Sequence, residues 1–323
     1  SYRLVGSEMC IRDSSYNDSL SADVDFSALT ETSSYLYFQY NYDAPALYLS
    51  ALETVGGTLY LAYNNDLETL DLGNLASVSG NFYVYYNNAL TSMTGTESLE
   101  WVNGYLQVSY HDLLAQDLDF SSLNEVDNYV TITYNDGITG LDLSALDSIG
   151  GSIQVIDNDD LTWADVGQVT TLPGALYFYS NAELALIDGI SDIETITSYL
   201  YIYDNALLES DISLPNLTEV GSYVDIRSNP LVENIDLSSL VSTDANLTIY
   251  NNGDVETVDL SSLQTVTTNL YFYNNTDMEI VDMSSLETVG GYFYIYNNDQ
   301  LTELEAPAPV SYTHLRAHET VRN

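Results

Sequence analysis

Residues 269–291 read NLYFYNNTDMEIVDMSSLETVGG, and this stretch contains the pattern that decides the fold. Leu270 and Phe272 are apolar residues two positions apart, and Asn275 follows three positions later. The same apolar–x–apolar–x–x–Asn pattern occurs twelve times in the chain at intervals of 23 or 24 residues, with His111 in place of the asparagine in one copy. A fixed repeat of this length predicts a solenoid, in which each coil packs only on its neighbours.

Each repeat predicts a short strand at its apolar pair. Leu270 and Phe272 alternate with Tyr271 and Tyr273, which is the period-2 pattern of a strand with one buried face. The asparagine that follows is expected to turn inward and to bond backbone groups of the coils on either side, which a repeating coil otherwise leaves unpaired. These structural turn asparagines are Asn41, Asn64, Asn87, Asn135, Asn158, Asn181, Asn205, Asn229, Asn252, Asn275 and Asn298.

A second short strand is predicted later in each repeat, as at residues 281–283, where the sequence Val-Asp-Met is followed by Ser-Ser-Leu. Glycine pairs close several coils, and we expect tight turns with positive φ there. These pairs are Gly56 with Gly57, Gly150 with Gly151, and Gly290 with Gly291. No segment has helical periodicity. The predicted fold class is therefore an all-β, right-handed solenoid of about 12 coils with little helix.

Both ends of the chain lie outside the repeat and resemble translated sequencing adapter. Residues 4–14 read LVGSEMCIRDS and residues 310–319 read VSYTHLRAHE, which the two strands of one transposase-type library adapter would encode. We therefore expect residues 1–15 and 310–323 to be adapter-like artefacts without order. Residues 16–309 are expected to form a single repeat solenoid, a fragment without clear caps.

The chain is strongly acidic, with a formal net charge of -43 at pH 7. Arg227 is the only lysine or arginine between the two adapter-like ends, and the single cysteine, Cys10, lies in the first of them. This charge repels phosphates and anionic lipids, so nucleic acid is excluded as a partner, whereas cations and cationic partners are favoured. No run of 18 apolar residues exists, so the sequence predicts no membrane-spanning segment.

The repeat LxxVGGxLYIxxNxxLxxLDLSSL resembles the leucine-rich repeat, and more closely its receptor L-domain-like type. The resemblance covers residues 24–304. It implies a secreted or surface-attached solenoid that binds a ligand rather than catalysing a reaction. The body of the chain lacks the cysteines of animal receptor ectodomains, so the resemblance points to a microbial cell-surface protein.

The outward positions of the first strand are rich in tyrosine and form the candidate ligand-binding surface. Since neighbouring strands lie about 4.8 Å apart, equivalent rings should form columns on one exposed sheet. The candidate ligand-binding residues are Tyr60, Tyr83, Tyr85, Tyr177, Tyr179, Tyr201, Tyr203, Tyr250, Tyr271, Tyr273, Tyr294 and Tyr296. A further column occupies the strand end in the first five repeats, at Tyr40, Tyr63, Tyr86, Tyr110 and Tyr134.

Two interpretations of these rings stay open. Tyrosine favours exposed strands and stacks across them, which contributes about 0.2–1 kcal/mol per pair without any ligand. Alternatively, rows of rings with hydroxyl groups form a recognition face for an extracellular polysaccharide or protein.

A column of aspartates in the second strand is the other candidate site. Its members are Asp25, Asp71, Asp119, Asp142, Asp188, Asp236, Asp259 and Asp282. Each carboxylate either accepts turn hydrogen bonds from the serines that follow it or contributes to calcium binding between coils. No EF-hand loop is present, so no metal ligands are assigned and calcium is the only cofactor that the pattern allows.

No catalytic residue is predicted. His111 is interpreted as a structural variant of the turn asparagine, and nothing resembles a nucleophile elbow, a phosphate loop or a zinc site. We expect a non-enzymatic recognition or adhesion module at the cell surface or outside the cell. The alternatives are a structural cell-wall or surface-layer protein without a discrete ligand, and a polysaccharide-cleaving β-helix enzyme.

Overall fold

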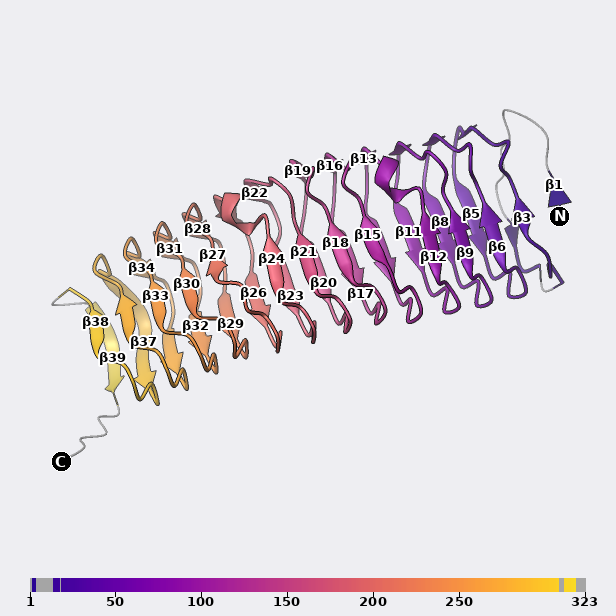
Figure 1. Ribbon diagram of the computed structural model, residues 1–323. Coiled ribbons are helices and arrows are strands. Elements are labelled where there is room, and N and C mark those ends of the chain that lie inside the picture. Colours follow the sequence, from indigo (N-terminus) through magenta and orange to yellow (C-terminus); the bar gives the residue numbers. More distant parts are fainter. Residues whose placement is uncertain (1, 4–13, 18, 308–310, 318–323) are drawn as a thin grey trace. The chain divides into compact units, whose positions relative to one another are not determined.

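The computed structural model describes residues 2–3, 14–17, 19–307 and 311–317. These residues form an all-β parallel solenoid of about 13 turns, of which about 2% is helical (Figure 1). The predicted solenoid with little helix is therefore confirmed.

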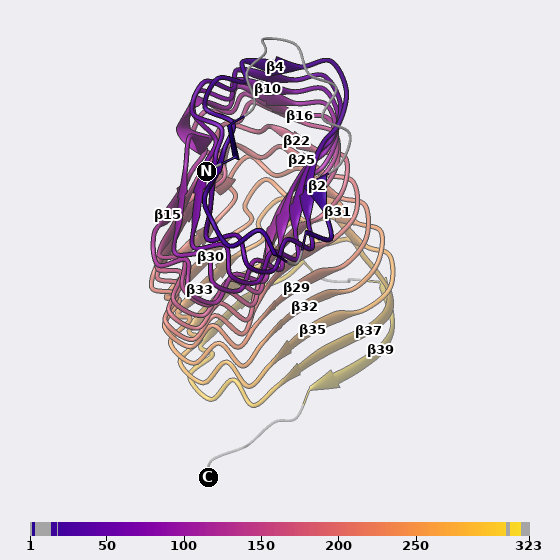
Figure 2. The ribbon, with the colours of Figure 1, turned by 90° about the vertical axis from the view of Figure 1, so that its right-hand side faces the viewer.

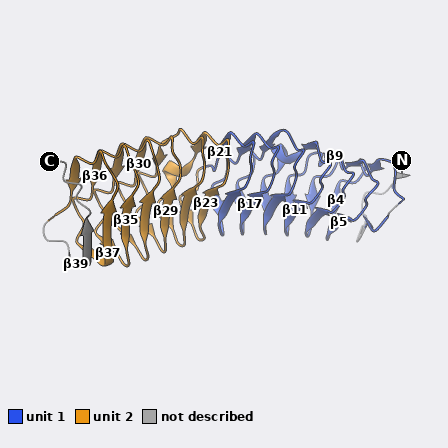
Figure 3. Cartoon of the chain, turned by 90° about the horizontal axis from the view of Figure 1, so that it is seen from below, with its two compact units in different colours: residues 1–167 blue, residues 168–323 orange. Residues whose placement is uncertain are grey.

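The chain divides into two compact units, residues 1–167 and 168–323, which are coloured separately in Figure 3. Because each coil of a solenoid contacts only its neighbours, no single core has to unite the whole chain. Both units are built from the same coil. The single repeat solenoid expected for residues 16–309 stays a prediction.

In unit 1, the first strand of each coil builds the tyrosine sheet of that unit. Its strands are β2 (Ser14–Ser15), β5 (Leu36–Gln39), β8 (Leu59–Ala62), β11 (Phe82–Tyr85), β14 (Leu106–Ser109), β17 (Val130–Thr133) and β20 (Ile153–Ile156). The second strands form the aspartate sheet, in which strand pairing is interrupted between β12 and β15. Its strands are β1 (Tyr2–Arg3), β3 (Val24–Asp25), β6 (Ala46–Tyr48), β9 (Thr69–Asp71) and β12 (Ser92–Thr94), and then β15 (Asp117–Asp119), β18 (Gly140–Asp142) and β21 (Trp163–Asp165). The third strands form the connecting sheet, with β4 (Glu31–Thr32), β7 (Thr54–Val55), β10 (Ser77–Val78), β13 (Trp101–Val102), β16 (Glu125–Val126) and β19 (Ser148–Ile149). A 3-10 helix, η1 (Thr96–Ser98), follows β12.

Unit 2 repeats the three sheets. Its tyrosine sheet contains β23 (Leu176–Tyr179), β26 (Leu200–Tyr203), β29 (Val224–Arg227), β32 (Leu247–Tyr250), β35 (Leu270–Tyr273), β37 (Thr288–Tyr296) and β39 (Ser311–Ala317). Its aspartate sheet contains β24 (Leu186–Asp188), which is followed by η2 (Ile190–Asp192) and does not pair with the next strand. The other strands, β27 (Ile212–Ser213), β30 (Asn234–Asp236), β33 (Thr257–Asp259), β36 (Ile280–Asp282) and β38 (Glu303–Glu305), pair in this order. Its connecting sheet contains β22 (Thr171–Leu172), β25 (Thr195–Ile196), β28 (Glu219–Val220), β31 (Ser242–Thr243) and β34 (Thr265–Val266). Figure 2 shows β29, β32, β35 and β37 side by side in one sheet, as their parallel pairing requires.

The apolar pair of each first strand lies in the core. In β35, Leu270 and Phe272 are 0% exposed, whereas Tyr271 and Tyr273 are half-buried on the outer face. Full burial of such an apolar side chain stabilises the fold by about 1.5–3 kcal/mol. Strand pairing is in register from coil to coil, with Leu247 opposite Leu270 and Leu270 opposite Phe293, so the core repeats along the unit.

The turn asparagines link the coils from inside. The side-chain Nδ2 of Asn64 donates to the carbonyl oxygen of Phe38 in the preceding coil at 2.9 Å. Its main-chain N–H donates to Oδ1 of Asn87 in the following coil at 3.0 Å. The same two bonds recur in unit 2, where Asn229 donates to the Ile202 carbonyl at 2.8 Å and to Asn252 at 3.1 Å. These asparagines therefore satisfy buried backbone groups of the neighbouring coils.

His111 occupies the asparagine position of its coil and is 0% exposed. Its Nδ1 lies 3.0 Å from Oδ1 of Asn135, so this nitrogen carries the proton, while its Nε2 lies 3.5 Å from Nδ2 of Asn87. Burial lowers the pKa of His111 to about 4. The imidazole ring is therefore neutral, and it takes the place of an asparagine in the buried row of turn residues.

The prediction for the glycine pairs was wrong. Positive φ occurs at Gly73, Gly95, Gly167 and Gly189, and not at the three predicted pairs. The pairs are needed for space instead, because a Cβ on Gly150 would lie 1.9 Å from the Asp127 carbonyl oxygen of the preceding coil.

Positive φ is instead a property of the residue directly before each turn asparagine, and also of the residues before His111 and Asn17. It ranges from 51° to 62° along the chain. The residues concerned are Tyr16, Tyr40, Tyr63, Tyr86, Tyr110, Tyr134, Asp157, Ser180, Asp204, Ser228, Asn251, Asn274 and Asn297. This left-handed conformation costs about 1–2 kcal/mol for most L-residues, and aspartate and asparagine tolerate it best. Six tyrosines at this position in unit 1 are thus unusual.

Residues 1–15 and 310–323 are expected to lack order. The structure nevertheless contains three strands within these ranges, β1, β2 and β39. In particular, β39 pairs in parallel with β37. The outermost strand of a solenoid presents unpaired N–H and C=O groups, with which another segment can pair. The remaining residues of these two ranges lie outside the described part of the chain, and their adapter origin stays a prediction.

Among the described residues, the two helical segments η1 and η2 are three residues long, and no helix is long and apolar enough to cross a membrane.

Candidate functional site

The tyrosine sheet of unit 2 carries two columns of outward side chains. The first column contains the residues between the apolar pair, namely Tyr177, Tyr201, Asp225, Thr248, Tyr271 and Tyr294. The second column contains the residues that follow the pair, namely Tyr179, Tyr203, Arg227, Tyr250, Tyr273 and Tyr296. The register therefore brings together all nine candidate tyrosines of this unit on one face, and each of them is half-buried.

Rings of the second column stack face to face. The ring centroids of Tyr179 and Tyr203 lie 4.5 Å apart with planes 6° from parallel. The centroids of Tyr250 and Tyr273 lie 4.4 Å apart at 16°, and Tyr296 continues the stack 5.3 Å from Tyr273. Burial in these stacks raises the pKa of Tyr203 and Tyr273 to about 12 each.

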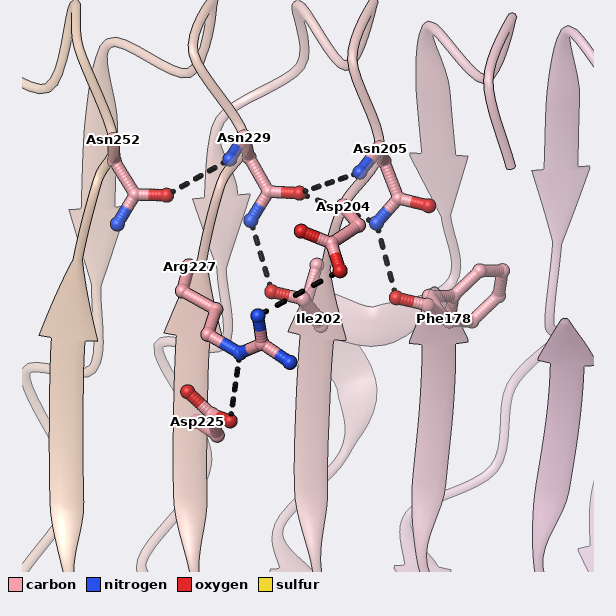
Figure 4. A network of polar contacts seen from close by, with 8 residues as sticks. All are labelled: Phe178, Ile202, Asp204, Asn205, Asp225, Arg227, Asn229 and Asn252. Carbon is pink, nitrogen blue, oxygen red and sulfur yellow. Dashed lines mark hydrogen bonds and ion pairs between the residues drawn. The ribbon is translucent and has the colours of Figure 1, made fainter. Parts of the chain in front are cut away.

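Arg227 fills the one position of the second column that lacks a ring. Its guanidinium carbon lies 4.0 Å from the ring centroid of Tyr203 and 5.6 Å from that of Tyr250. A guanidinium over an aromatic face is attracted by the ring quadrupole and also stacks on it because it is planar. The guanidinium of Arg227 therefore continues the row of stacked rings in the second column. Figure 4 shows Arg227 with the two carboxylates that it contacts, Asp204 and Asp225.

Two carboxylates hold Arg227 in place. Its Nε donates to Oδ2 of Asp225 at 3.1 Å, and one terminal nitrogen lies 3.6 Å from Oδ2 of Asp204. Burial raises the pKa of Asp225, although the bond from Arg227 opposes this shift. The other carboxylate oxygen of Asp225, Oδ1, is buried without a hydrogen-bond partner. The group is therefore two carboxylates around one guanidinium, with one oxygen left unsatisfied.

Unit 1 brings its three candidates together in a different way. The ring centroids of Tyr60 and Tyr85 lie 5.3 Å apart, edge to face, and the Tyr85 hydroxyl donates to the Tyr60 hydroxyl. Tyr83 lies 6.1 Å from Tyr60, also edge to face. Burial, followed by the bond to Tyr60, raises the pKa of Tyr85.

The longest stack of unit 1 lies in its third column, just before the turn asparagines, and was not among the candidate residues. Six rings stack there with planes within 11° of parallel and centroids 4.1–5.1 Å apart. They belong to Tyr16, Tyr40, Tyr63, Tyr86, Tyr110 and Tyr134. Ring stacking offsets part of the cost of positive φ at these positions.

A fourth set of tyrosines, one position before the apolar pair, was not predicted from the sequence. It comprises Tyr35, Tyr105, Tyr129, Tyr199, Tyr223 and Tyr292. Tyr35, Tyr223 and Tyr292 are 49%, 41% and 51% exposed, and the Tyr223 ring stacks 5.9 Å from Tyr199. A scan of every position of the repeat for tyrosine would have found this column.

The stacks determine which part of each ring a ligand can reach. In the second column of unit 2, neighbouring rings cover one another's faces, so edges and hydroxyl groups remain available. In the first column the rings are tilted, at 58° between Tyr177 and Tyr201 and 78° between Tyr271 and Tyr294. The first column therefore offers more ring face to a ligand than the second.

The aspartates of the second strand cap the turn that follows them. Oδ1 of Asp236, Asp259 and Asp282 accepts the main-chain N–H of the serine two residues later, at 3.0, 2.9 and 2.9 Å. Asp25, Asp71, Asp119 and Asp142 make the equivalent bond. Within the described ranges, no three or more His, Cys, Asp or Glu side chains gather as a metal site would require.

Comparison with protein-family models, curated proteins and solved structures found no match for the chain. The leucine-rich-repeat type therefore remains a prediction from the sequence.

Proposed function

We propose that the chain is a non-enzymatic recognition or adhesion module whose tyrosine sheet binds a protein or a glycan outside the cell or at its surface. The observation that carries this proposal is the first column of unit 2, where tilted, half-buried tyrosines present ring faces and hydroxyl groups in register. Such rings combine apolar contact area with a polar group, which suits recognition surfaces.

The electrostatics and the buried polar groups agree with binding rather than catalysis. His111 is fully buried and bonded to asparagines, so it offers no accessible proton donor or acceptor. The aspartates of the second strand are engaged in turn hydrogen bonds. The resemblance of the repeat to the receptor L-domain-like type of leucine-rich repeat adds to the proposal of a cell-surface protein.

A structural cell-wall or surface-layer role is the second candidate, and the stacked third column of unit 1 favours it. There the six rings contact one another along the ladder, which stabilises successive coils without any ligand. If the chain is a recognition module, removal of outward tyrosines should reduce ligand binding. If its role is structural, their removal should reduce the stability of the coils.

Replacement of Tyr201, Tyr271 and Tyr273 by serine is expected to abolish binding to the glycans or proteins that the wild type captures on arrays, while the β circular dichroism spectrum stays unchanged. The matched control is Tyr48→Ser, which removes an outward tyrosine from the aspartate sheet at β6 and should leave binding intact. Retention of every wild-type ligand by the triple variant would contradict the recognition role.

A further inference from the structure

One pair of outward tyrosines in unit 1 is joined through its hydroxyl groups. The Tyr85 hydroxyl on β11 donates to the Tyr60 hydroxyl on β8, in the preceding coil. The two ring centroids lie 5.3 Å apart, with planes 81° from parallel. Both side chains are half-buried on the outer face of the tyrosine sheet, so each ring is partly accessible to solvent.

Neither ring of this pair is held in a face-to-face stack. The ring contacts of Tyr60 and Tyr85 are all edge to face, with planes 67° to 88° from parallel. The neighbouring ring of Tyr63, by contrast, is stacked on both faces, by Tyr40 at 4.9 Å and by Tyr86 at 5.1 Å. Tyr60 and Tyr85 can therefore move toward each other without breaking a stack.

This geometry suits the formation of a carbon–carbon bond between the two rings. After a tyrosine loses one electron and its hydroxyl proton, the unpaired electron is shared by the oxygen and by the ring carbons ortho and para to it. The para carbon carries Cβ, so two such rings couple through ortho carbons, and the new bond lies in the planes of both rings. Hydrogen-bonded hydroxyl groups bring two ortho carbons close together, and the steep angle between the planes of Tyr60 and Tyr85 becomes the twist about the new bond.

A parallel stack does not offer this geometry. Tyr86 and Tyr110 are closer, with centroids 4.1 Å apart, but their planes are only 8° from parallel. Their ortho carbons therefore face ring planes, and both rings would have to turn out of the stack before they could couple.

The composition restricts other covalent links between coils. The chain has one cysteine, so no disulfide can form within it, and it has no lysine that could form an isopeptide bond. A bond between Tyr60 and Tyr85 would join residues 25 positions apart in two neighbouring coils. Such a cross-link stabilises a fold mainly because it reduces the conformational entropy of the unfolded chain.

We propose that Tyr60 and Tyr85 form a site of oxidative cross-linking, at which a haem peroxidase with hydrogen peroxide joins the two rings as dityrosine. Each phenol gives up one electron and one proton, and the two unpaired electrons pair in the new bond between ortho carbons. The hydrogen on each of these carbons then moves to the oxygen of its own ring, which restores the hydroxyl group. Hydrogen peroxide takes up the two electrons and two protons and becomes two molecules of water. This modification does not depend on the proposed recognition role.

The test is to treat dilute wild type with a peroxidase and hydrogen peroxide and to analyse the single-chain fraction. Cleavage at acidic residues separates the two tyrosines, because Asp66, Glu68 and Asp71 lie between them. Mass spectrometry should find the peptide of Tyr60 joined to that of Tyr85 with the loss of two hydrogen atoms, together with dityrosine fluorescence. The cross-linked protein should also unfold at a higher denaturant concentration than the untreated protein.

Tyr60→Phe keeps the ring and should abolish this joined peptide pair. The matched control is Tyr63→Phe, which removes a hydroxyl group from the same coil and should leave the pair in place, because Tyr60 and Tyr85 stay in contact. Thermal melts establish that both variants are folded. Cross-links confined to stacked pairs such as Tyr86 with Tyr110, cross-links found only between separate chains, or no cross-link at all would overturn the inference.

Discussion

Replacement of Asn229 by leucine is expected to lower the free energy of unfolding of unit 2 by about 4 kcal/mol. Oδ1 of Asn229 accepts the main-chain N–H of Asn205 at 3.3 Å and its Nδ2 at 3.2 Å, while Nδ2 of Asn229 donates to the Ile202 carbonyl at 2.8 Å (Figure 4). Leucine keeps the volume but removes all three bonds. Because the site is 0% exposed, water cannot replace them, and each orphaned group costs about 1–3 kcal/mol.

Denaturant unfolding followed by circular dichroism measures this loss, and hydrogen exchange should show the Asn205 amide losing protection. The control is Asn216→Ala, which removes an exposed asparagine bonded to the Ser191 carbonyl and should cost less than about 0.5 kcal/mol. A leucine variant as stable as this control would show that the asparagine ladder does not hold the coils together.

Replacement of His111 by asparagine is expected to remove a pH dependence of stability worth about 3 kcal/mol. Burial lowers the pKa of His111 from an ordinary value of 6.5 to about 4. The folded state therefore requires the neutral ring, whereas the unfolded chain takes up a proton as the pH falls below 6.5. The wild type should thus lose stability relative to His111→Asn as the pH falls from about 6.5 to about 4, and no further below that range.

The measurement is the difference in unfolding free energy between the two proteins across this pH range. Protonation of the many carboxylates changes both proteins alike, so the difference isolates the histidine. A difference that stays constant from pH 7 to pH 4 would contradict the buried neutral ring.

Much of the coil could be predicted from the sequence, because burial dictates residue type at the inward positions. The alternation of Leu270 and Phe272 with tyrosines gave the strand, and the recurring asparagine indicated an inward polar group. The backbone conformation was harder to predict from the sequence. Positive φ falls on the residue before the asparagine, where closure of the coil imposes it even on Tyr40 and Tyr110, whose side chains do not favour it.

For the candidate site, the sequence predicted only that the tyrosines lie in columns on one sheet. Register follows from the repeat, so the alignment of Tyr201 with Asp225 could be expected. Ring orientation depends on side-chain rotamers and neighbours, which a repeat pattern does not specify. The insertion of Arg227 between Tyr203 and Tyr250, and the stack that leaves only edges exposed in the second column, therefore required the structure.

The most direct test of the recognition role is hydroxyl-radical footprinting of the wild type with and without a ligand found on the arrays. Bound ligand should protect Tyr201, Tyr271 and Tyr294 on the tyrosine sheet, while Tyr48 on the aspartate sheet keeps its reactivity. Protection confined to the aspartate sheet or the connecting sheet, with the tyrosines of unit 2 unchanged, would contradict the proposal that the tyrosine sheet is the binding surface.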